Sequence, residues 1–352
     1  MQRVSQQLIR ELSVKDSVTV FKETINAAGK GQIAAQTAFF LFKQLMELPH
    51  RARDVGADVI LFSSMVTASL AWGIRDRVDI PMVTINHGKD VTLPFSLYQW
   101  FIPKVFEALD GVISVSRATR SECIKRGMDP QKGVALPNGM DLDRLNNFPE
   151  KKKSRTKIQQ KFEIPLNQKL MLLTVGRMVE RKGHEWFVRE VMPRLDEHFV
   201  YVTVGDGPQA DDISRAAGEV PYSDRIFLLG RQPDSILKHA YAAADLFVMP
   251  NIPVQGDMEG FGIVLLEANM ANTPAVAADL EGIRDVIAQG KNGYRVPSRN
   301  AKEFADKIDE LTNGSYTEFS ERARSYVKKH FNWNYVAGQY VEYLEDVIRE
   351  NA

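Results

Sequence analysis

The sequence is poor in cysteine, in long apolar runs and in net charge, and each shortage excludes a class of protein. One cysteine, Cys123, stands among 352 residues, which excludes an internal disulfide and indicates a reducing compartment. No apolar run reaches the ~18–20 residues that span a bilayer, and the polar start (MQRVSQQLIRELS) has no signal core. Lys plus Arg and Asp plus Glu both total 45, so no basic field favours nucleic acid. We therefore expect a cytoplasmic protein that binds no nucleic acid.

The pattern along the chain is one of short apolar runs between helical stretches. The runs predicted as strands are Ser17–Phe21, Asp58–Ser63, Met82–Asn86, Gly111–Ser116, Val134–Leu136, Leu170–Val175, Val200–Val204, Arg225–Leu229, Leu246–Met249 and Ala275–Ala278. Several are apolar on both faces, as buried parallel strands are. Strand–helix alternation of this kind predicts an α/β fold with two Rossmann-like, doubly wound parallel sheets.

Three segments are expected along the chain. The charged run Pro149–Arg155 is typical of a linker, so a first domain over 1–149 and a second over 150–330 are predicted. The remainder, 331–352, contains a helix over about Asn334–Arg349 whose apolar stripe (Tyr335, Val336, Tyr340, Leu344 and Ile348) needs a partner.

The segment with the strongest signal of a functional site is Glu-Gly-Phe-Gly at 259–262. It is followed by a helix pattern that contains Glu267. Glycines before a helix let a ligand approach the backbone, and the helix start offers free N–H groups to an anion. Carboxylates such as Glu259 and Glu267 accept hydrogen bonds from hydroxyls, which sugars supply in pairs. The segment therefore indicates a sugar or nucleotide site.

Two further loops follow predicted strands. Gly176 ends one strand, and Arg177 and Lys182 follow it five residues apart, which suits a diphosphate as well as a solvated basic loop. Gly205-Asp206-Gly207-Pro208 matches a dinucleotide fingerprint in form, but the acidic residue expected after the next strand is absent. A tight turn near a nucleobase or phosphate is the better interpretation.

His87 and an acidic pair complete the candidates. His87 follows the strand Met82–Asn86, where it is either a polar or acid/base group of the site or a surface histidine. Asp141 and Asp143 form a D-x-D, but they are predicted to cap the following helix rather than to bind metal. No His/Cys cluster with metal spacing is present, so no metal site is expected.

These motifs occur together and in a recognisable order: Pro-Asn-Gly-Met-Asp, Gly-Arg-(four residues)-Lys-Gly, Gly-Asp-Gly-Pro, and Glu-Gly-Phe-Gly with a second glutamate eight residues after the first. In this order the chain resembles glycosyltransferase family 4, from about Pro81 onward. The resemblance implies a retaining glycosyltransferase with the GT-B fold, in which two Rossmann-like domains face each other across a cleft. It also implies that the last helix crosses back to the first domain.

The resemblance also implies roles for individual residues. Glu267 would bind the ribose hydroxyls, Glu259 the donor sugar, and Arg177 with Lys182 the diphosphate, while His87 would lie near the sugar. The backbone amides expected at sugar and phosphate are those of Phe261, Gly262, Ile263 and Val264. The backbone at Gly230 and Arg231 would read the base. The nucleotide-sugar is then a substrate, and no cofactor or metal ion is required.

Several alternatives stay open. The family usually begins with a strand and a Gly-rich loop that are missing at the front of this chain, so a non-catalytic nucleotide-sugar-binding protein is one alternative. Another is a different GT-B enzyme, such as a nucleotide-sugar epimerase or a phosphorylase. UDP-, GDP- and ADP-sugars are equal candidates for the donor, and a glycan, a glycolipid or a small molecule for the acceptor. The aromatic stretch Leu93–Phe101 is either an interfacial contact with the inner face of a membrane or a helix packed in the core.

Overall fold

A computed structural model describes residues 2–24, 33–314 and 316–352, which form two compact units. Unit 1 comprises Met1–Gly139 and Trp333–Ala352, and unit 2 comprises Met140–Asn332. The chain leaves unit 1 after Gly139, before the end expected at residue 149, and returns to it at Trp333.

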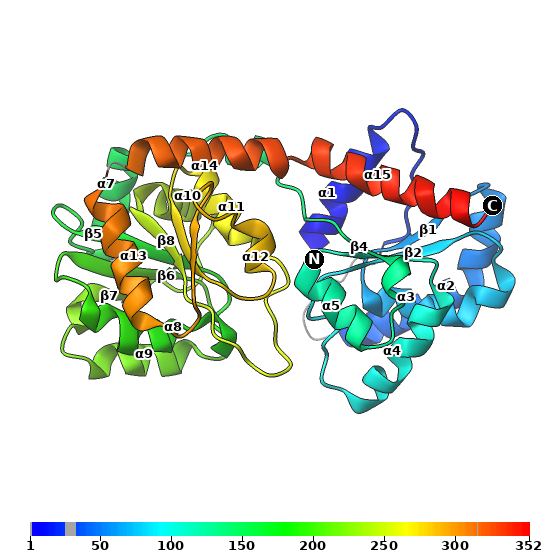
Figure 1. Ribbon diagram of the computed structural model, residues 1–352, viewed down its shortest axis with the longest axis horizontal. Helices are drawn as coiled ribbons and strands as arrows, with labels where there is room; N and C mark the ends of the chain where they lie inside the picture. Colours follow the sequence, from blue (N-terminus) through cyan, green and yellow to red (C-terminus); the bar gives the residue numbers. More distant parts are fainter. Residues whose placement is uncertain (1, 25–32, 315) are drawn as a thin grey trace. The chain divides into compact units, whose positions relative to one another are not determined.

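Unit 1 is built on a four-stranded parallel sheet in the order β1-β2-β3-β4 (Figure 1). The strands are β1 (Ile60–Phe62), β2 (Met82–Asn86), β3 (Gly111–Ser114) and β4 (Gly133–Ala135). The helices are α1 (Gln2–Ser13), α2 (Ile33–Asp54), α3 (Met65–Ile74), α4 (Ser96–Ala108), α5 (Arg117–Lys125) and α15 (Trp333–Glu350). Serine caps fix two helix starts: the Ser64 hydroxyl accepts from Thr67 N, and that of Ser116 from Thr119 N.

Helix α15 supplies a hydroxyl to the sheet of unit 1. The Tyr343 hydroxyl accepts a hydrogen bond from Val112 N (3.0 Å) and donates one to Lys132 O (2.6 Å). The buried stripe of α15 runs through Val336, Ala337, Tyr340, Leu344 and Val347. Tyr335, which the sequence assigned to that stripe, is 49% exposed, because the helix presents its neighbours to the core instead.

Unit 2 contains a six-stranded parallel sheet in the order β10-β9-β8-β5-β6-β7. The strands are β5 (Leu170–Val175), β6 (Phe199–Val204), β7 (Ile226–Leu228), β8 (Leu246–Met249), β9 (Ala275–Ala278) and β10 (Tyr294–Val296). On one side of the sheet the strands follow in the order β5, β6, β7, and on the other side in the order β8, β9, β10, so the direction of the chain order reverses between β5 and β8. The crevice at the carboxyl ends of β5 and β8 is therefore a topological switch point, where open α/β sheets bind their ligands.

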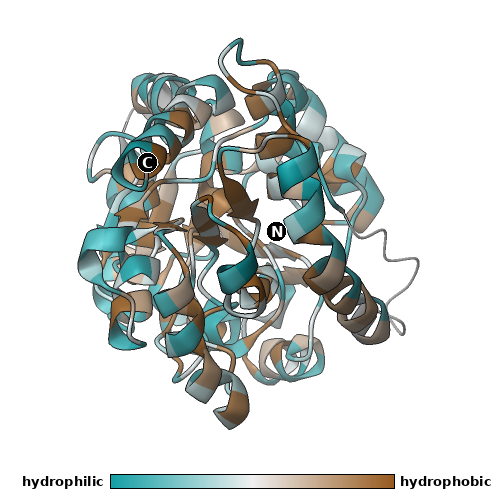
Figure 2. Ribbon diagram, turned by 90° about the vertical axis from the view of Figure 1, so that its right-hand side faces the viewer, coloured by the Kyte–Doolittle hydropathy of each residue, from teal (hydrophilic) through white to brown (hydrophobic). Residues whose placement is uncertain are grey.

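Helices cover both faces of this sheet (Figure 1). They are α6 (Leu142–Leu145), α7 (Lys151–Phe162), α8 (His184–Trp186), α9 (Ala210–Glu219), α10 (Asp234–Ala243), α11 (Ile263–Met270), α12 (Ile283–Val286), α13 (Ala301–Asn313) and α14 (Tyr316–His330). The central strands β6, β8 and β9 are buried on both faces. Strands of unit 1, the side that faces the viewer in Figure 2, are likewise brown, the hydrophobic end of the scale, between helices of mixed hydropathy. Burial of both faces requires helices on both sides.

Two further sequence predictions are wrong. Ser17–Phe21 is not a strand: its side chains are exposed or half-buried, Phe21 at 62%, so no core face stabilises pairing. Pro149–Arg155 is not a linker, because α7 begins at Lys151. Its basic residues Lys151 and Arg155 form ion pairs of 2.7 and 2.8 Å with Asp245.

Candidate active site

Backbone hydrogen bonds join the neighbouring strand ends that carry the expected glycines. Gly176, Gly205 and Gly230 follow β5, β6 and β7; Gly176 N donates to Val204 O (3.0 Å) and Gly205 N donates to Gly230 O (2.9 Å). Gly205 has φ +155°, and a Cβ placed on it would lie 1.7 Å from Gly176 O. No other residue fits at 205, so the carboxyl edge of the sheet is close-packed backbone there.

The loops after β5 and β8 meet through charged side chains. Lys182 Nζ lies 2.5 Å from Glu259 Oε2, and Arg181 Nη1 binds the same oxygen. Asn251 Nδ2 donates to it as well, at 3.2 Å. Lys182 and Glu259 are 6% and 8% exposed. The sequence-predicted residues Lys182 and Glu259 therefore form a buried ion pair at the switch point.

Electrostatics keep this carboxylate ionised. Burial alone would raise the pKa of Glu259, but Lys182 and Arg181 lower it from 4.5 to about 2. Burial lowers the pKa of Lys182, and the Glu259 carboxylate opposes that shift. The result is a desolvated cluster of two cations and two carboxylates, because Arg181 also lies 3.3 Å from Asp257 Oδ1.

A buried histidine anchors the lysine loop to the sheet. His184 begins α8 directly after Gly183, and its Nδ1 lies 3.0 Å from the Tyr201 hydroxyl on β6. Burial lowers the pKa of His184 to about 3, so the ring is neutral at pH 7. Sequence analysis missed His184, because its role depends on a residue of the next strand.

The start of α11 has the geometry expected from its sequence. Gly262 is the N-cap residue with φ +88°, in the left-handed region that glycine tolerates. Phe261 is buried, and Ile263 and Val264, half-buried, form the first turn. The amides of a first turn have no acceptor within the helix.

Glu267 lies one turn further along α11, and its carboxylate is hydrogen-bonded to two other side chains. Its Oε1 accepts from Arg144 Nη2 (2.5 Å), and its Oε2 accepts from the Tyr241 hydroxyl (2.8 Å). The cap prediction is confirmed for Asp141, whose Oδ1 accepts from Arg144 N (3.1 Å). Arg144 and Tyr241 carried no motif that would have singled them out in the sequence.

The remaining candidates do not join this cluster. Arg177, Asp206 and Arg231 are exposed, and Arg177 makes no ion pair with any residue that the structure describes. Asp206 supports its own turn, since its side chain accepts from Gly207 N (2.7 Å). Arg181, rather than Arg177, shares Glu259 with Lys182.

His87 belongs to unit 1, where it follows β2. Its backbone N donates to Asp90 Oδ1 (2.8 Å), and its Nε2 lies 3.0 Å from Ser63 O. A carbonyl only accepts, so Nε2 carries the proton and donates. Burial lowers the pKa of His87, against the effect of Asp90, which leaves a neutral ring with Nδ1 as an acceptor.

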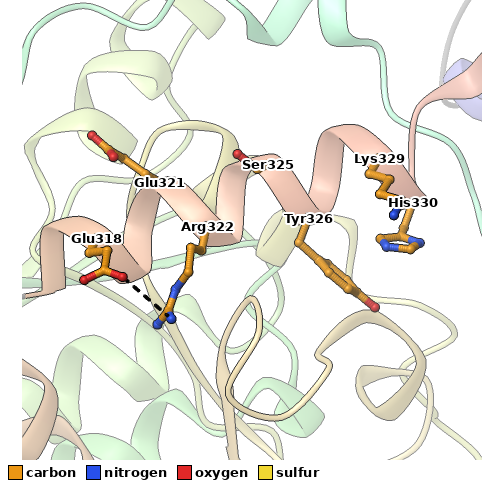
Figure 3. Close-up of a pocket in the computed structure, with 7 residues that line it drawn as sticks. All are labelled: Glu318, Glu321, Arg322, Ser325, Tyr326, Lys329 and His330. Atoms are coloured by element: carbon orange, nitrogen blue, oxygen red, sulfur yellow. Dashed lines mark ion pairs between the residues drawn. The ribbon is translucent and has the colours of Figure 1, made fainter.

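A shallow hollow elsewhere in unit 2 contains none of the predicted site residues. Figure 3 shows it along α14, where its lining comes from one helix: Glu318, Glu321, Arg322, Ser325, Tyr326, Lys329 and His330. Within the described ranges, no group of three His, Cys, Asp or Glu side chains is placed to hold a metal ion. None of the helices described is both long and apolar enough to cross a membrane.

Comparison with known families gives one match in each half of the chain, in agreement with an α/β fold built on two parallel sheets. The model described as Glycosyltransferase Family 4 matches residues 26–144, and Glycosyl transferases group 1 matches residues 154–330. The chain belongs to glycosyltransferase family 4, has the GT-B fold and is a glycosyltransferase.

Individual relatives are similar over most of the chain. A phosphatidyl-myo-inositol mannosyltransferase of Mycobacterium leprae is 30% identical over 78% of this chain and 70% of its own. The amylovoran biosynthesis glycosyltransferase AmsK of Erwinia amylovora is 24% identical over 92% and 78%. Among solved structures, Anabaena HepE in complex with UDP has a TM-score of 0.72 at 19% identity, over 90% and 83% of the two chains.

Proposed function

We propose that this glycosyltransferase is a retaining enzyme that moves a hexosyl group from a nucleoside diphosphate sugar to a hydroxyl of a glycan, glycolipid or small-molecule acceptor. The observation that carries the proposal is the buried Lys182–Glu259 pair beside the N-terminus of α11, at the switch point of the sheet. Related proteins support it: one is named a phosphatidyl-myo-inositol mannosyltransferase, and another was solved with UDP-glucose.

Each part of the site has a proposed contact with the donor. Lys182 and Arg177 bind the diphosphate, Glu267 binds the ribose, and Glu259 faces the sugar. The amides of Phe261, Gly262, Ile263 and Val264 bind sugar and phosphate oxygens at the helix start. The backbone of Gly205, Asp206, Gly230 and Arg231 lies against the base and ribose, and Gly176 leaves room for the phosphates.

The proposed reaction proceeds on one face of the sugar. The bond between the anomeric carbon and the phosphate oxygen breaks, and a bond to the acceptor oxygen forms on the same side. The acceptor proton passes to the departing phosphate oxygen, so no enzymatic nucleophile is used. Lys182, Arg177 and the α11 amides stabilise the charge that grows on the diphosphate. His87 is proposed as the neutral polar group of unit 1 near the sugar.

A donor screen followed by product analysis tests this proposal. UDP-, GDP- and ADP-sugars are screened by thermal unfolding, where the true donor at about 100 Kd adds ~2.7 kcal/mol. The stabilising donor is then offered with acceptors, and NMR of the product should show the anomeric configuration of the donor. An inverted product would refute retention. Epimerised donor without acceptor would favour an epimerase, and binding without turnover a non-catalytic protein.

The enzyme is also expected to work without a metal ion. In the proposed site Lys182 and Arg177 neutralise the charge of the diphosphate, which a divalent cation does in metal-dependent enzymes. Turnover should stay unchanged when EDTA is added after exhaustive dialysis. Loss of turnover that only Mn²⁺ or Mg²⁺ restores would show that carboxylates such as Asp143 bind a metal after all.

Peripheral membrane contact is proposed for the surface of α4. Phe95, Leu97 and Trp100 are 64%, 76% and 61% exposed, and Lys104 Nζ lies 3.8 Å from the centre of the Trp100 ring. Exposed aromatic and basic side chains together suit the interface of an anionic bilayer. Replacing Leu97 and Trp100 by serine should weaken co-sedimentation with phosphatidylglycerol vesicles about tenfold or more. Val14→Ser, at a site 70% exposed, is the control; an equal effect of the control would refute α4 as the contact.

A further inference from the structure

The Glu267 carboxylate is held from two sides by side chains that no motif identifies. Arg144 on α6 binds Oε1 at 2.5 Å, and Tyr241 on α10 binds Oε2 at 2.8 Å. The second terminal nitrogen of Arg144 lies 3.2 Å from Asp234 Oδ2 at the start of α10. Three helices distant in sequence therefore converge on one carboxylate.

These contacts leave Glu267 able to accept more. A carboxylate has about four acceptor positions, two on each oxygen. Arg144 takes one on Oε1 and Tyr241 takes one on Oε2, so one position remains on each oxygen. A ribose presents two neighbouring O–H donors, which need one acceptor position on each of two adjacent oxygens.

The surroundings also fix the orientation of the carboxylate. The Glu267 side chain is 12% exposed and that of Arg144 is 24% exposed, while Tyr241 is 2% exposed. Burial raises the pKa of Tyr241 well above its usual value, so its hydroxyl stays protonated and donates. Arg144 is itself fixed by the Asp141 cap on its backbone and by Asp234 on its side chain.

We propose that Arg144 and Tyr241 are positioning residues that hold the Glu267 carboxylate for both ribose hydroxyls and so make the enzyme discriminate ribonucleotides from deoxyribonucleotides. The inference rests on the proposed function, in which Glu267 binds the ribose of the donor. It adds that selection of the ribose depends on residues that do not contact it.

Calorimetry on the full chain tests the proposal, with the nucleoside diphosphate of the donor found in the screen and its 2′,3′-dideoxy counterpart. Wild type should bind the ribose form about tenfold or more tightly than the dideoxy form. Arg144→Gln should weaken the ribose form about tenfold and change the dideoxy form by less than about threefold, so the preference collapses. Donor KM should rise with kcat nearly constant, because the ribose does not react.

Conservative and matched variants separate positioning from general damage. Arg144→Lys keeps the charge and should restore part of the preference, and Tyr241→Phe should lose part of it. Arg155→Gln is the control, because Arg155 is 22% exposed and pairs with Asp245 at 2.8 Å in the same unit. It should lower the melting temperature and keep the preference for ribose. If Arg144→Gln does not fold, Arg144→Lys and Tyr241→Phe carry the test.

The outcomes distinguish the two proposals. If wild type prefers the ribose form and the Arg144 and Tyr241 variants keep that preference, the positioning role is overturned and the proposed function stands. Tighter binding of the ribose form by Arg144→Gln would also overturn it, since Arg144 would then compete with ribose. If wild type binds no nucleoside diphosphate, the proposed function fails and the inference fails with it.

Discussion

Lys182→Ala is expected to lower kcat/KM for glycosyl transfer by two decades or more, which corresponds to about 2.7 kcal/mol of transition-state stabilisation. Lys182 is buried, so its charge acts on the leaving diphosphate with little screening by water. Arg177→Ala should have an effect of similar size, although Arg177 is exposed before the donor binds. Initial rates at varied donor concentration measure both variants.

An arginine of the same unit serves as control. Arg189 is exposed and pairs with Glu185 and Glu219, so Arg189→Ala should leave kcat/KM unchanged. Measuring Arg181→Ala in the same assay tests the second cation at this carboxylate, because Arg181 shares Glu259 with Lys182. Turnover within about threefold of wild type in both Lys182→Ala and Arg177→Ala would remove the diphosphate assignment.

Glu259→Gln is expected to lower the free energy of unfolding at pH 7 by about 3 kcal/mol, because it leaves Lys182 buried without its counter-ion. The pH dependence follows from the lowered pKa. The folded value is about 2 against 4.5 for a free glutamate, so the carboxylate stabilises the fold above pH 4.5. This contribution is lost as the pH falls toward 2, where the difference between variant and wild type should vanish.

Denaturant unfolding at pH 7 and at several values below 4.5 measures this effect. Glu197→Gln, at an exposed position of unit 2, is the matched control and should change stability by less than about 0.5 kcal/mol. A loss at pH 7 no larger than that of the control would show that the buried pair does not stabilise the fold. Turnover should fall in Glu259→Gln as well, since the same carboxylate faces the donor sugar in the proposed site.

Some elements were predictable from sequence because one local property determines them. β2, β5, β8 and β9 have the predicted bounds, since strands buried on both faces are mostly apolar and show no alternating polar face. β10 was missed because Tyr294-Arg295-Val296 is a half-exposed edge strand with a charged centre. The α7 helix was missed because its basic residues find their partner, Asp245, about 90 residues away.

The candidate site, like the fold, was only partly predictable from the sequence. Glycines and charged residues at strand ends were recognisable, because their type and spacing carry the signal. Which of them touch was not, since Lys182 and Glu259 are 77 residues apart and Arg144 and Glu267 are 123 apart. Residue type and spacing therefore gave Lys182, Glu259 and Glu267 as separate candidates, which only the family resemblance assigned to one donor. The structure adds the side chains that hold them.

The order of the two units along the chain has a consequence for synthesis. Unit 2 is inserted into unit 1, and its two ends are tied together, because Met140 N donates to Phe331 O (2.6 Å). Unit 1 needs α15, on which α1 packs and whose Tyr343 binds Val112 N, so a growing chain completes unit 2 first. Until α15 leaves the ribosome, α1, which carries the buried side chains Leu8 and Leu12, lacks one of its packing partners. We therefore expect the nascent chain to leave part of the apolar surface of unit 1 uncovered during the synthesis of unit 2, a state that favours aggregation.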